Sequence, residues 1–265
     1  MIIAQITDLH ITTPGALLGG VVDTTAYLRA AVDHVNSRDP KPDLALLTGD
    51  LVDAGTAEEY GHLRALLAPL DMPYYPIPGN HDGRDAMREA FADHAAMPAD
   101  GFIQYVVEAG PLRLIALDTH APGEPGGRLC AARLDWLAAR LDEAPDRPTV
   151  IFMHHPPIAT GVAYMDAMGL YEGGAELGAL LARHGNIEAV LCGHVHRAIA
   201  TRWNGTMVSV MPSTAHQVGL TLRPTRKPGL VFEPPCVGLH WWSPDARLVS
   251  HVSYVTDHPL VPRAP

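Results

Sequence analysis

Short apolar runs that alternate with amphipathic helical patterns are the feature that most restricts the fold of this chain. From residue 1 to about residue 193, runs such as MIIAQIT, DLALLT and TVIFMHH are separated by segments with apolar residues at helical spacing, such as AARLDWLAARLDEA. This alternation is typical of α/β proteins in which helices cover a sheet. We therefore predict an α/β fold for this part of the chain.

From about Arg197 onward the pattern changes to strands joined by turns. Segments such as AIATRWNGTMVSV and ARLVSHVSYV read as strands, and no helical pattern follows them. We expect residues 197–265 to complete a second sheet within one domain that spans residues 1–265, a length that a single domain can reach. Three tryptophans of this part are candidates for contacts in a homo-oligomer, a dimer or higher, with core packing as the alternative: Trp203, Trp241 and Trp242.

The charge of the chain restricts its partners. The net charge is −10, with 19 Lys and Arg against 29 Asp and Glu. A broad basic surface for nucleic acid is therefore not expected, and a small-molecule substrate is favoured. No apolar run reaches the roughly 18 residues of a membrane span, and the start MIIAQITDLH lacks the charged flank of a signal peptide. We predict a cytoplasmic protein that does not enter a membrane.

Metal-binding side chains follow each of the first three predicted strands. TDLHIT supplies Asp8 and His10, LTGDLVDAG supplies Asp50, and PIPGNHDGR supplies Asn80. Residues two apart in an extended segment point the same way, so Asp8 and His10 can present two ligands to one place. The prolines and Gly79 of the third motif indicate a turn whose backbone is fixed before its side chains bind anything.

Two later apolar runs end in histidines. VIFMHHPPI supplies His154 and His155, and VLCGHVHR supplies His194 and His196. Imidazole and carboxylate together suit divalent transition ions such as Fe, Mn and Zn. Because these candidates exceed what one ion takes, we expect two divalent ions that share a bridging carboxylate, for which Asp50 is the natural candidate.

The ordered motifs DLH, GD, GNHD, HHPP and GHVH, which span residues 8–196, resemble those of the calcineurin-like metallophosphoesterase superfamily. They are most similar to its small bacterial phosphodiesterases, which act on cyclic AMP or on glycerophosphodiesters. The resemblance implies a four-layer αββα sandwich of two mixed sheets flanked by helices. It also implies one ion held by Asp8, His10, Asp50 and His196, and a second held by Asp50, Asn80, His154 and His194. In the HHPP motif the family pattern favours the first histidine, with His155 as the alternative.

The turn that carries Asn80 also carries candidates for chemistry. The resemblance makes Asn80 a ligand through its amide oxygen and turns His81 toward the substrate. There His81 can protonate the departing alkoxide, with support of the loop as the alternative. Asp82 is expected to brace the turn. Arg84 is a candidate for phosphate contact, with plain surface exposure as the alternative.

Two further features belong to the predicted substrate site. His216, in the segment STAHQV, matches a family position close to the substrate, although the segment could equally be a plain strand entry. The segment ATGVAYMDAMGLYEGG, residues 159–174, mixes Gly, Met and Tyr without a clean period. A loop of this kind beside a metal site is a candidate specificity element, with a packed core excursion as the alternative.

These features predict a metal-dependent hydrolase of small phosphodiesters that uses a hydroxide held between two ions. Two divalent ions, two ligand carboxylates and that hydroxide leave about +1, which suits a monoanionic diester without excluding a dianionic monoester. A broad phosphomonoesterase or protein phosphatase is one alternative, but Ala54 and the sequence GNHD depart from the protein phosphatase pattern. A scaffold that binds partners without catalysis is the other, and every expected ligand position is filled.

Overall fold

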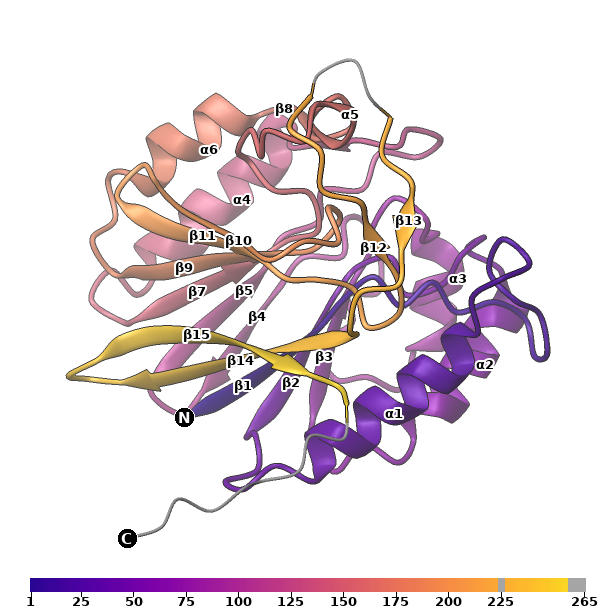
Figure 1. The fold of residues 1–265 in the computed structure, drawn as a ribbon. Coiled ribbons are helices and arrows are strands. Elements are labelled where there is room, and N and C mark those ends of the chain that lie inside the picture. Colours follow the sequence, from indigo (N-terminus) through magenta and orange to yellow (C-terminus); the bar gives the residue numbers. More distant parts are fainter. Residues whose placement is uncertain (224–226, 257–265) are drawn as a thin grey trace, which may run out of the picture.

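Two mixed β-sheets lie face to face, and helices cover the outer face of each sheet (Figure 1). The computed structural model describes residues 1–223 and 227–256. One sheet has five strands in the order β15-β14-β1-β2-β3, and the other has six strands in the order β10-β11-β9-β7-β5-β4. The predicted α/β fold, with its four layers, is confirmed.

In the five-stranded sheet, the first three strands along the chain are parallel, and the last two add in antiparallel fashion beside β1. Parallel neighbours bring their carboxyl ends to the same edge of the sheet, so the residues that follow them meet there. The strands are β1 (Ile2–Ile6), β2 (Leu44–Thr48), β3 (Tyr74–Ile77), β14 (Cys236–Ser243) and β15 (Arg247–Tyr254).

The six-stranded sheet has a parallel centre and an antiparallel strand at each edge. Its strands are β4 (Tyr105–Ala109), β5 (Leu112–Ala116), β7 (Thr149–Phe152), β9 (Ile187–Cys192), β10 (Ile199–Trp203) and β11 (Thr206–Val210). Two short pairs lie outside these sheets: β6 (Gly127–Arg128) with β8 (Leu170–Glu172), and β12 (Gln217–Val218) with β13 (Leu230–Val231).

The helices divide between the two outer faces (Figure 1). On the side of the five-stranded sheet lie α1 (Thr24–Asn36), α2 (Ala57–Leu67) and α3 (Arg84–Ala90), and on the side of the six-stranded sheet lie α4 (Ala131–Asp142) and α6 (Gly174–Leu181). The short α5 (Ala163–Asp166) lies between β7 and β8 in the chain. On α1 the buried residues Leu28, Ala31, Val32 and Val35 follow the spacing of one helix face.

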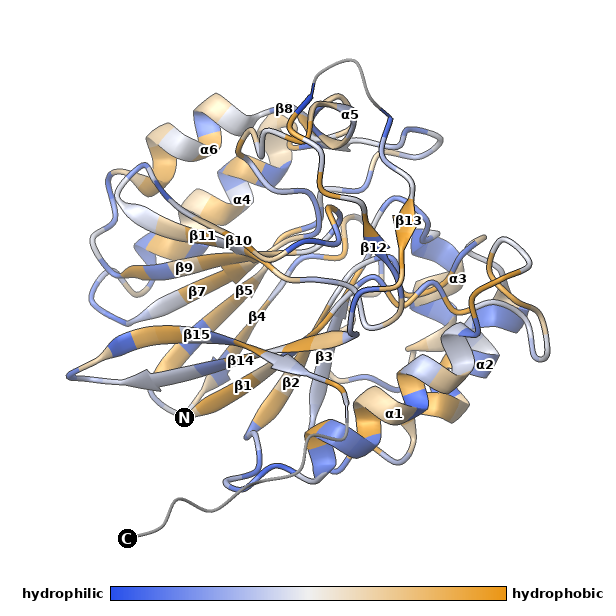
Figure 2. Ribbon diagram, viewed as in Figure 1, coloured by the Kyte–Doolittle hydropathy of each residue, from blue (hydrophilic) through white to orange (hydrophobic). Residues whose placement is uncertain are grey.

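The central strands of the six-stranded sheet are apolar on both sides because both sides are buried. On β7, Val150 and Phe152 join the core between the two sheets, whereas Ile151 joins the core under α4 and α6. On β9, Leu191 and Val190 divide in the same way. Since side chains alternate along a strand, a continuous apolar run serves two layers at once. Figure 2 shows these strands mostly in the hydrophobic colour.

Residues 197–265 were expected to complete a single sheet, but their strands divide between the two sheets. Strands β10 and β11 extend the six-stranded sheet, whereas β14 and β15 extend the five-stranded sheet. Of the tryptophans, Trp242 is buried in the core that includes the five-stranded sheet, Trp203 is partly buried against the core under α4 and α6, and Trp241 is 44% exposed. Residues 257–265 of this part lie outside the described residues.

Among the helices that the structure describes, none combines the length and the apolar character needed to cross a lipid bilayer. The helices are short, and Figure 2 shows hydrophobic and hydrophilic residues mixed along them. This pattern is the one that helices on the outside of a sheet require.

Candidate metal centre

The predicted ligands sit where strands end, and their backbone is unusual. Five of them have positive φ values, between 44° and 70°, in the left-handed region that side chains other than glycine rarely adopt: Asp8, His10, Asp50, His194 and His196. Such conformations cost free energy and persist only where the surroundings enforce them. Their concentration at the ends of β1, β2 and β9 indicates a functional site.

Two motif glycines are required by space. A side chain at Gly79 would overlap the carboxylate of Asp50 and the ring of His154, and one at Gly193 would overlap Thr7 and the carboxylate of Asp8. Gly79 does not have a positive φ, so its role in the turn is close approach of the backbone rather than the conformational freedom that the sequence suggested. The two sheets meet at this edge with almost no room between the strand ends.

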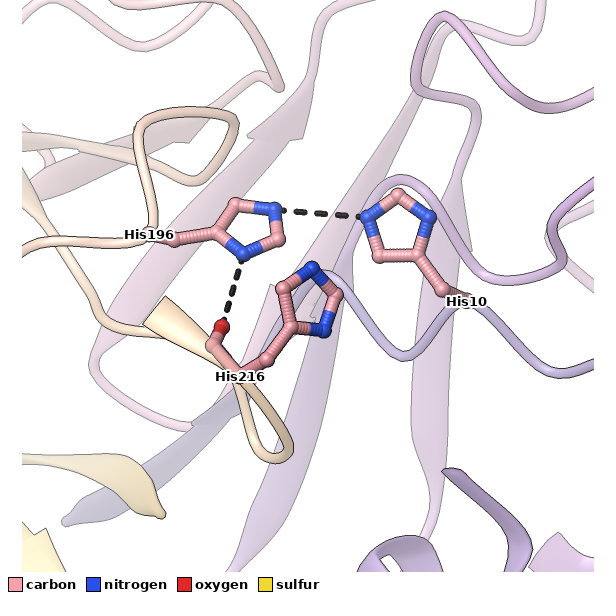
Figure 3. Close-up of side chains that lie close together, drawn as sticks. All are labelled: His10, His196 and His216. Carbon is pink, nitrogen blue, oxygen red and sulfur yellow. Dashed lines mark hydrogen bonds between the residues drawn. The ribbon is translucent and has the colours of Figure 1, made fainter. Parts of the chain in front are cut away.

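One group of side chains converges from β1, β2 and β9. His10 Nε2 lies 3.3 Å from His196 Nε2 and 3.7 Å from Asp50 Oδ2. His196 Nε2 lies 3.2 Å from Asp8 Oδ1. Figure 3 shows the rings of His10 and His196 facing each other, with the ring of His216 beside them. These distances are those of ligand atoms arranged around a common point.

A second group converges from β2, β3, β7 and β9. His154 Nε2 lies 3.3 Å from Asp50 Oδ2 and 3.3 Å from Asn80 Oδ1. His194 Nδ1 lies 3.1 Å from the same oxygen of Asn80. Asp50 Oδ2 therefore belongs to both groups, because it is close to His154 on one side and to His10 on the other.

The hydrogen bonds behind the histidines fix which nitrogen faces the centre. His154 Nδ1 lies 2.8 Å from the carbonyl oxygen of Thr48, and His196 Nδ1 lies 2.9 Å from that of His216. A carbonyl oxygen only accepts, so each Nδ1 carries a hydrogen and each neutral ring presents the lone pair of Nε2. Convergent lone pairs and carboxylate oxygens, each ring held from behind, fit divalent transition ions.

The buried carboxylates of the centre are ionised. Burial alone would raise the pKa of Asp8, but the charge and hydrogen bond of His196 outweigh it and lower the pKa to about 2. For Asp50 burial is likewise opposed, by His154, and the pKa falls well below its ordinary value. Buried negative charge requires nearby positive charge, which metal ions supply.

His81 lies at the rim of the centre, with its ring edge-on to the ring of His10 at 4.6 Å. Its Nδ1 donates to the carbonyl oxygen of Asp53 at 2.7 Å, and the Asp53 carboxylate lies 3.4 Å from the same nitrogen. Burial would lower the pKa of His81, but Asp53 and the charge of Asp50 raise it to about 10. Sequence reasoning missed Asp53, although it stands three residues after Asp50 in the same motif.

Asp82 braces the turn, as predicted. Its carboxylate accepts hydrogen bonds from the backbone nitrogens of Gly79 and Leu51 and from the hydroxyl of Tyr60, at 2.8, 3.1 and 2.7 Å. The turn that carries Asn80 is thereby tied to β2 and to α2. The backbone N–H of His81 also donates to Asp50 Oδ1 at 2.9 Å, which orients the shared carboxylate.

The structure does not bring Arg84 into the centre, in contrast to the prediction of phosphate contact. Its guanidinium binds the carboxylate of Asp118 through Nε at 2.6 Å and through Nη2 at 2.9 Å, and it also donates to the carbonyl oxygen of His120. Because the planar fork is used by a buried carboxylate, little of it remains for a substrate.

His155 lies behind the centre. Its Nδ1 lies 2.8 Å from the hydroxyl of Thr119 and its Nε2 3.4 Å from the carbonyl oxygen of Pro125, and its ring contacts that of His194 at a tilt of 51°. Of the HHPP pair, His154 is the histidine that approaches Asp50 and Asn80. His155 therefore supports the loop that carries Pro125.

A cavity of about 400 Å³ opens over the centre. The polar side of its lining comes from the centre and its rim, with His216 among these residues. The apolar residues of the lining come from four other parts of the chain: the loop with Leu18, the loop with Pro125, the segment with Tyr164, Met165 and Met168, and the hairpin with Val218 and Leu230. The structure thus places part of the segment 159–174 beside the centre.

The chain is similar to known sequences over most of its length. It is 39% identical over 255 residues to a probable glycerophosphodiester phosphodiesterase of Arcobacter nitrofigilis, an alignment that covers 96% of this chain and 93% of the relative. It is 33% identical over 217 residues to the 3′,5′-cyclic adenosine monophosphate phosphodiesterase of Escherichia coli K12, with 81% and 76% covered.

Solved structures share the fold. A dimetal phosphatase from Danio rerio superposes with a TM-score of 0.70 at 15% identity and covers 97% of both chains. The model of the family described as calcineurin-like phosphoesterase matches residues 1–198, which contain all five motifs. The chain therefore belongs to the calcineurin-like phosphoesterase family.

Proposed function

We propose that this chain is a metal-dependent hydrolase of small phosphodiesters. The observation that carries the proposal is the position of Asp50 Oδ2, which lies 3.3 Å from His154 Nε2 and 3.7 Å from His10 Nε2. One carboxylate oxygen between two groups of ligand atoms fits a pair of ions about 3.5–4 Å apart, the spacing used for displacement at phosphorus.

The two ligand sets of the proposal follow from these groups. Asp8, His10, Asp50 and His196 would hold one ion, and Asp50, Asn80, His154 and His194 would hold the other. Divalent ions in these sites would act as Lewis acids on a phosphoryl oxygen and would activate water at neutral pH. The mixed nitrogen and oxygen donors suit Fe, Mn or Zn.

The protein itself supplies the proton for the leaving group. In hydrolysis, the oxygen of water forms a bond to phosphorus and loses one proton to solvent, from which His81 is later reprotonated, and the ester P–O bond breaks to release an alkoxide. His81 holds a proton, and its Nδ1 is occupied by Asp53, so Nε2–H is the group that it offers to the cavity. His81 would give this proton to the alkoxide, which leaves as an alcohol beside a phosphate monoester. His216, in the same lining, would contact the substrate.

The names of the relatives support a diester as the substrate. The Arcobacter relative is named for glycerophosphodiesters and the Escherichia coli relative for cyclic AMP. Both are phosphodiesters, so hydrolysis of this bond is the activity that the names share. A cytoplasmic location and a homo-oligomeric state complete the proposal, and size-exclusion chromatography with light scattering tests the latter.

Hydrolysis by metal-stripped protein refilled with Mn(II) or Zn(II) tests the proposal. The substrates are bis(p-nitrophenyl) phosphate, a diester, and p-nitrophenyl phosphate, a monoester. We expect metal-dependent turnover that favours the diester and is reduced in Asn80→Ala. Asn36→Ala serves as the control, because the amide of Asn36 binds Pro69 and Asp71 outside the centre. Absence of turnover with every metal, in protein that has bound two ions, would contradict the proposal and favour a scaffold.

A further inference from the structure

The described lining of the cavity over the metal centre contains two chemically different sets of residues. One set is made of the polar residues of the centre and its rim. The other set is apolar apart from the hydroxyl of Tyr164, and we call it the apolar wall (Leu18, Pro125, Tyr164, Met165, Met168, Val218 and Leu230). A diester bound with its phosphorus at the centre occupies the same cavity, which brings an ester arm within reach of this wall.

The central part of the apolar wall is preformed. Met165 and Met168, on and after α5, pack against the core under α4 and α6. Asp166 fixes the start of the segment, because its carboxylate accepts from the backbone nitrogen of Thr160 at 2.8 Å and from that of Gly161 at 3.0 Å. Because the wall is already ordered, its side chains lose little further conformational entropy when a ligand binds.

The hairpin strands β12 and β13 supply the rest of the apolar wall through Val218 and Leu230. The segments that continue from these strands reach α5 in Figure 1, and the ammonium of Lys227 lies 5.1 Å from the ring centre of Tyr164. Leu230 is 53% exposed, so an apolar surface stands open at the cavity. Leu18 closes the wall from a loop of the five-stranded half.

We propose that the apolar wall makes this site selective for diesters that carry an aromatic ring on the retained ester arm, the arm that stays on phosphorus, with Tyr164 and Met168 as the specificity-determining residues. The inference rests on the proposed phosphodiesterase function. Tyrosine offers a flat face to another ring, and a methionine sulfur interacts favourably with aromatic rings. A nucleoside arm and a simple aryl arm both have this chemistry.

A glycerol arm does not match the wall. Its two hydroxyls would be withdrawn from water, and the wall offers them one side-chain hydroxyl, that of Tyr164. Polar groups that lose water without new partners weaken binding. An aromatic ring removes its own apolar surface and that of the wall from water together.

Four diesters with the same leaving group test the inference. Each is a p-nitrophenyl phosphate ester, and the second ester arm is thymidine linked through its 5′ oxygen, phenyl, glyceryl or methyl. Because p-nitrophenolate leaves in every case, differences in kcat/KM report the second arm. For the Mn(II)-loaded protein we expect the aromatic arms to exceed the methyl and glyceryl arms at least about tenfold. The two aromatic arms distinguish a nucleoside from a simple aryl group.

Variants of the wall locate the effect. In Tyr164→Ser and Met168→Gln we expect the ratio of kcat/KM for the aromatic arms to kcat/KM for the methyl arm to fall several-fold. Tyr164→Phe keeps the ring and should keep the preference. Tyr27→Ser on α1 and Met207→Gln on β11 are matched controls outside the cavity lining.

The outcomes separate the two proposals. Hydrolysis of the methyl ester with equal or faster turnover of the glyceryl ester would overturn the inference and leave the proposed function standing. An aromatic preference that survives both wall variants would also overturn it. Failure to hydrolyse any of the four esters, by folded protein with two ions bound, would overturn the proposed function and the inference with it.

Discussion

The protein has two buried clusters of charged side chains, and they differ in which groups balance the charge of their carboxylates. In the Asp118 cluster (Asp118, Arg84 and Arg133), the carboxylate accepts from Arg84 and from the backbone nitrogens of Ile103 and His120, the last two at 2.9 Å each. Arg133 lies over the ring of Phe102 at 4.1 Å and donates to the backbone oxygen of Asp118. The protein itself supplies every charge that this carboxylate needs.

The carboxylates of the metal centre have no such arginine partners among the described residues of the cavity lining. Its carboxylates and imidazoles converge on one another, and no arginine or lysine lies among the described residues of its cavity lining. Nε2 of His10 and Nε2 of His196 lie 3.3 Å apart, and a cation bound there would take both as ligands. The comparison shows that buried charge alone does not mark a functional site; carboxylates whose charged neighbours in the described lining are histidines able to bind a metal do.

The largest effect should follow from removing the shared oxygen. In Asp50→Asn we expect kcat/KM for the diester to fall about 10³-fold, because loss of a bridging carboxylate disturbs both ions and their stabilisation of the transition state. Metal content per chain, measured by plasma mass spectrometry, should fall as well. Asp71→Asn, an exposed carboxylate paired with Lys41, is the control. Full activity with two ions bound to Asp50→Asn would show that the shared carboxylate is not needed to hold the ions.

Removing the carboxylate of the other cluster should cost stability rather than metal. In Asp118→Ala we expect the free energy of unfolding to fall by about 3–5 kcal/mol, because Arg84 and Arg133 lose a buried partner. Urea unfolding measures the change. Asp135→Ala, an exposed position on α4, should stay within about 0.5 kcal/mol of wild type. If Asp118→Ala unfolded like wild type but bound no metal, the two clusters would not be separate.

Loss of His81 should affect catalysis in a way that depends on the leaving group. In His81→Gln we expect kcat for 3′,5′-cyclic AMP to fall about 10²-fold, because an alkoxide departs poorly without a proton. The loss should be smaller for bis(p-nitrophenyl) phosphate, whose phenolate leaves unprotonated. Equal losses for both substrates would indicate that His81 supports the loop and transfers no proton.

A change in the pH dependence of stability is expected at His240, a buried group whose ring nitrogens both have partners within the protein. Its ring nitrogens lie 3.0 Å from Gln5 Oε1 and 2.8 Å from Ser250 Oγ, and burial, aided by His251, lowers its pKa to about 3. Between the ordinary pKa of 6.5 and 3, the unfolded chain binds a proton that the folded chain does not, so stability falls as the pH falls.

This difference gives His240 a contribution of about 1.4 kcal/mol per pH unit in that window. Urea unfolding of metal-free protein from pH 6.5 to pH 4 should show a shallower loss of stability in His240→Gln than in wild type. Metal-free protein is used for both, so that release of ions does not enter the comparison. Parallel curves would show that the folded protein accepts a proton at His240.

The candidate centre could be predicted from the sequence because its residues stand at strand ends in fixed short motifs. Asp8 with His10 and His194 with His196 needed no knowledge of the fold beyond the strands that precede them. The brace formed by Asp82 followed from its place in a turn. The segment 159–174 was identified as a specificity element by composition, and Tyr164 does line the cavity.

What the sequence did not indicate depends on distant partners. Arg84 follows the GNHD motif by only a few residues, but its partner Asp118 lies 34 residues away at the end of β5. The division of residues 197–265 between two sheets is of the same kind, because β14 pairs with β1 from the other end of the chain. Alternation along a strand predicts which faces are buried but not which strand lies beside it.

Anomalous diffraction from crystals grown with Mn(II) shows directly whether two ions share the carboxylate of Asp50. We predict two peaks about 3.5–4 Å apart, one beside His10 and His196 and the other beside His154 and His194, with a carboxylate oxygen of Asp50 between them. A single peak, or two peaks of which one lies away from Asp50, would contradict the claim that one shared carboxylate builds this centre.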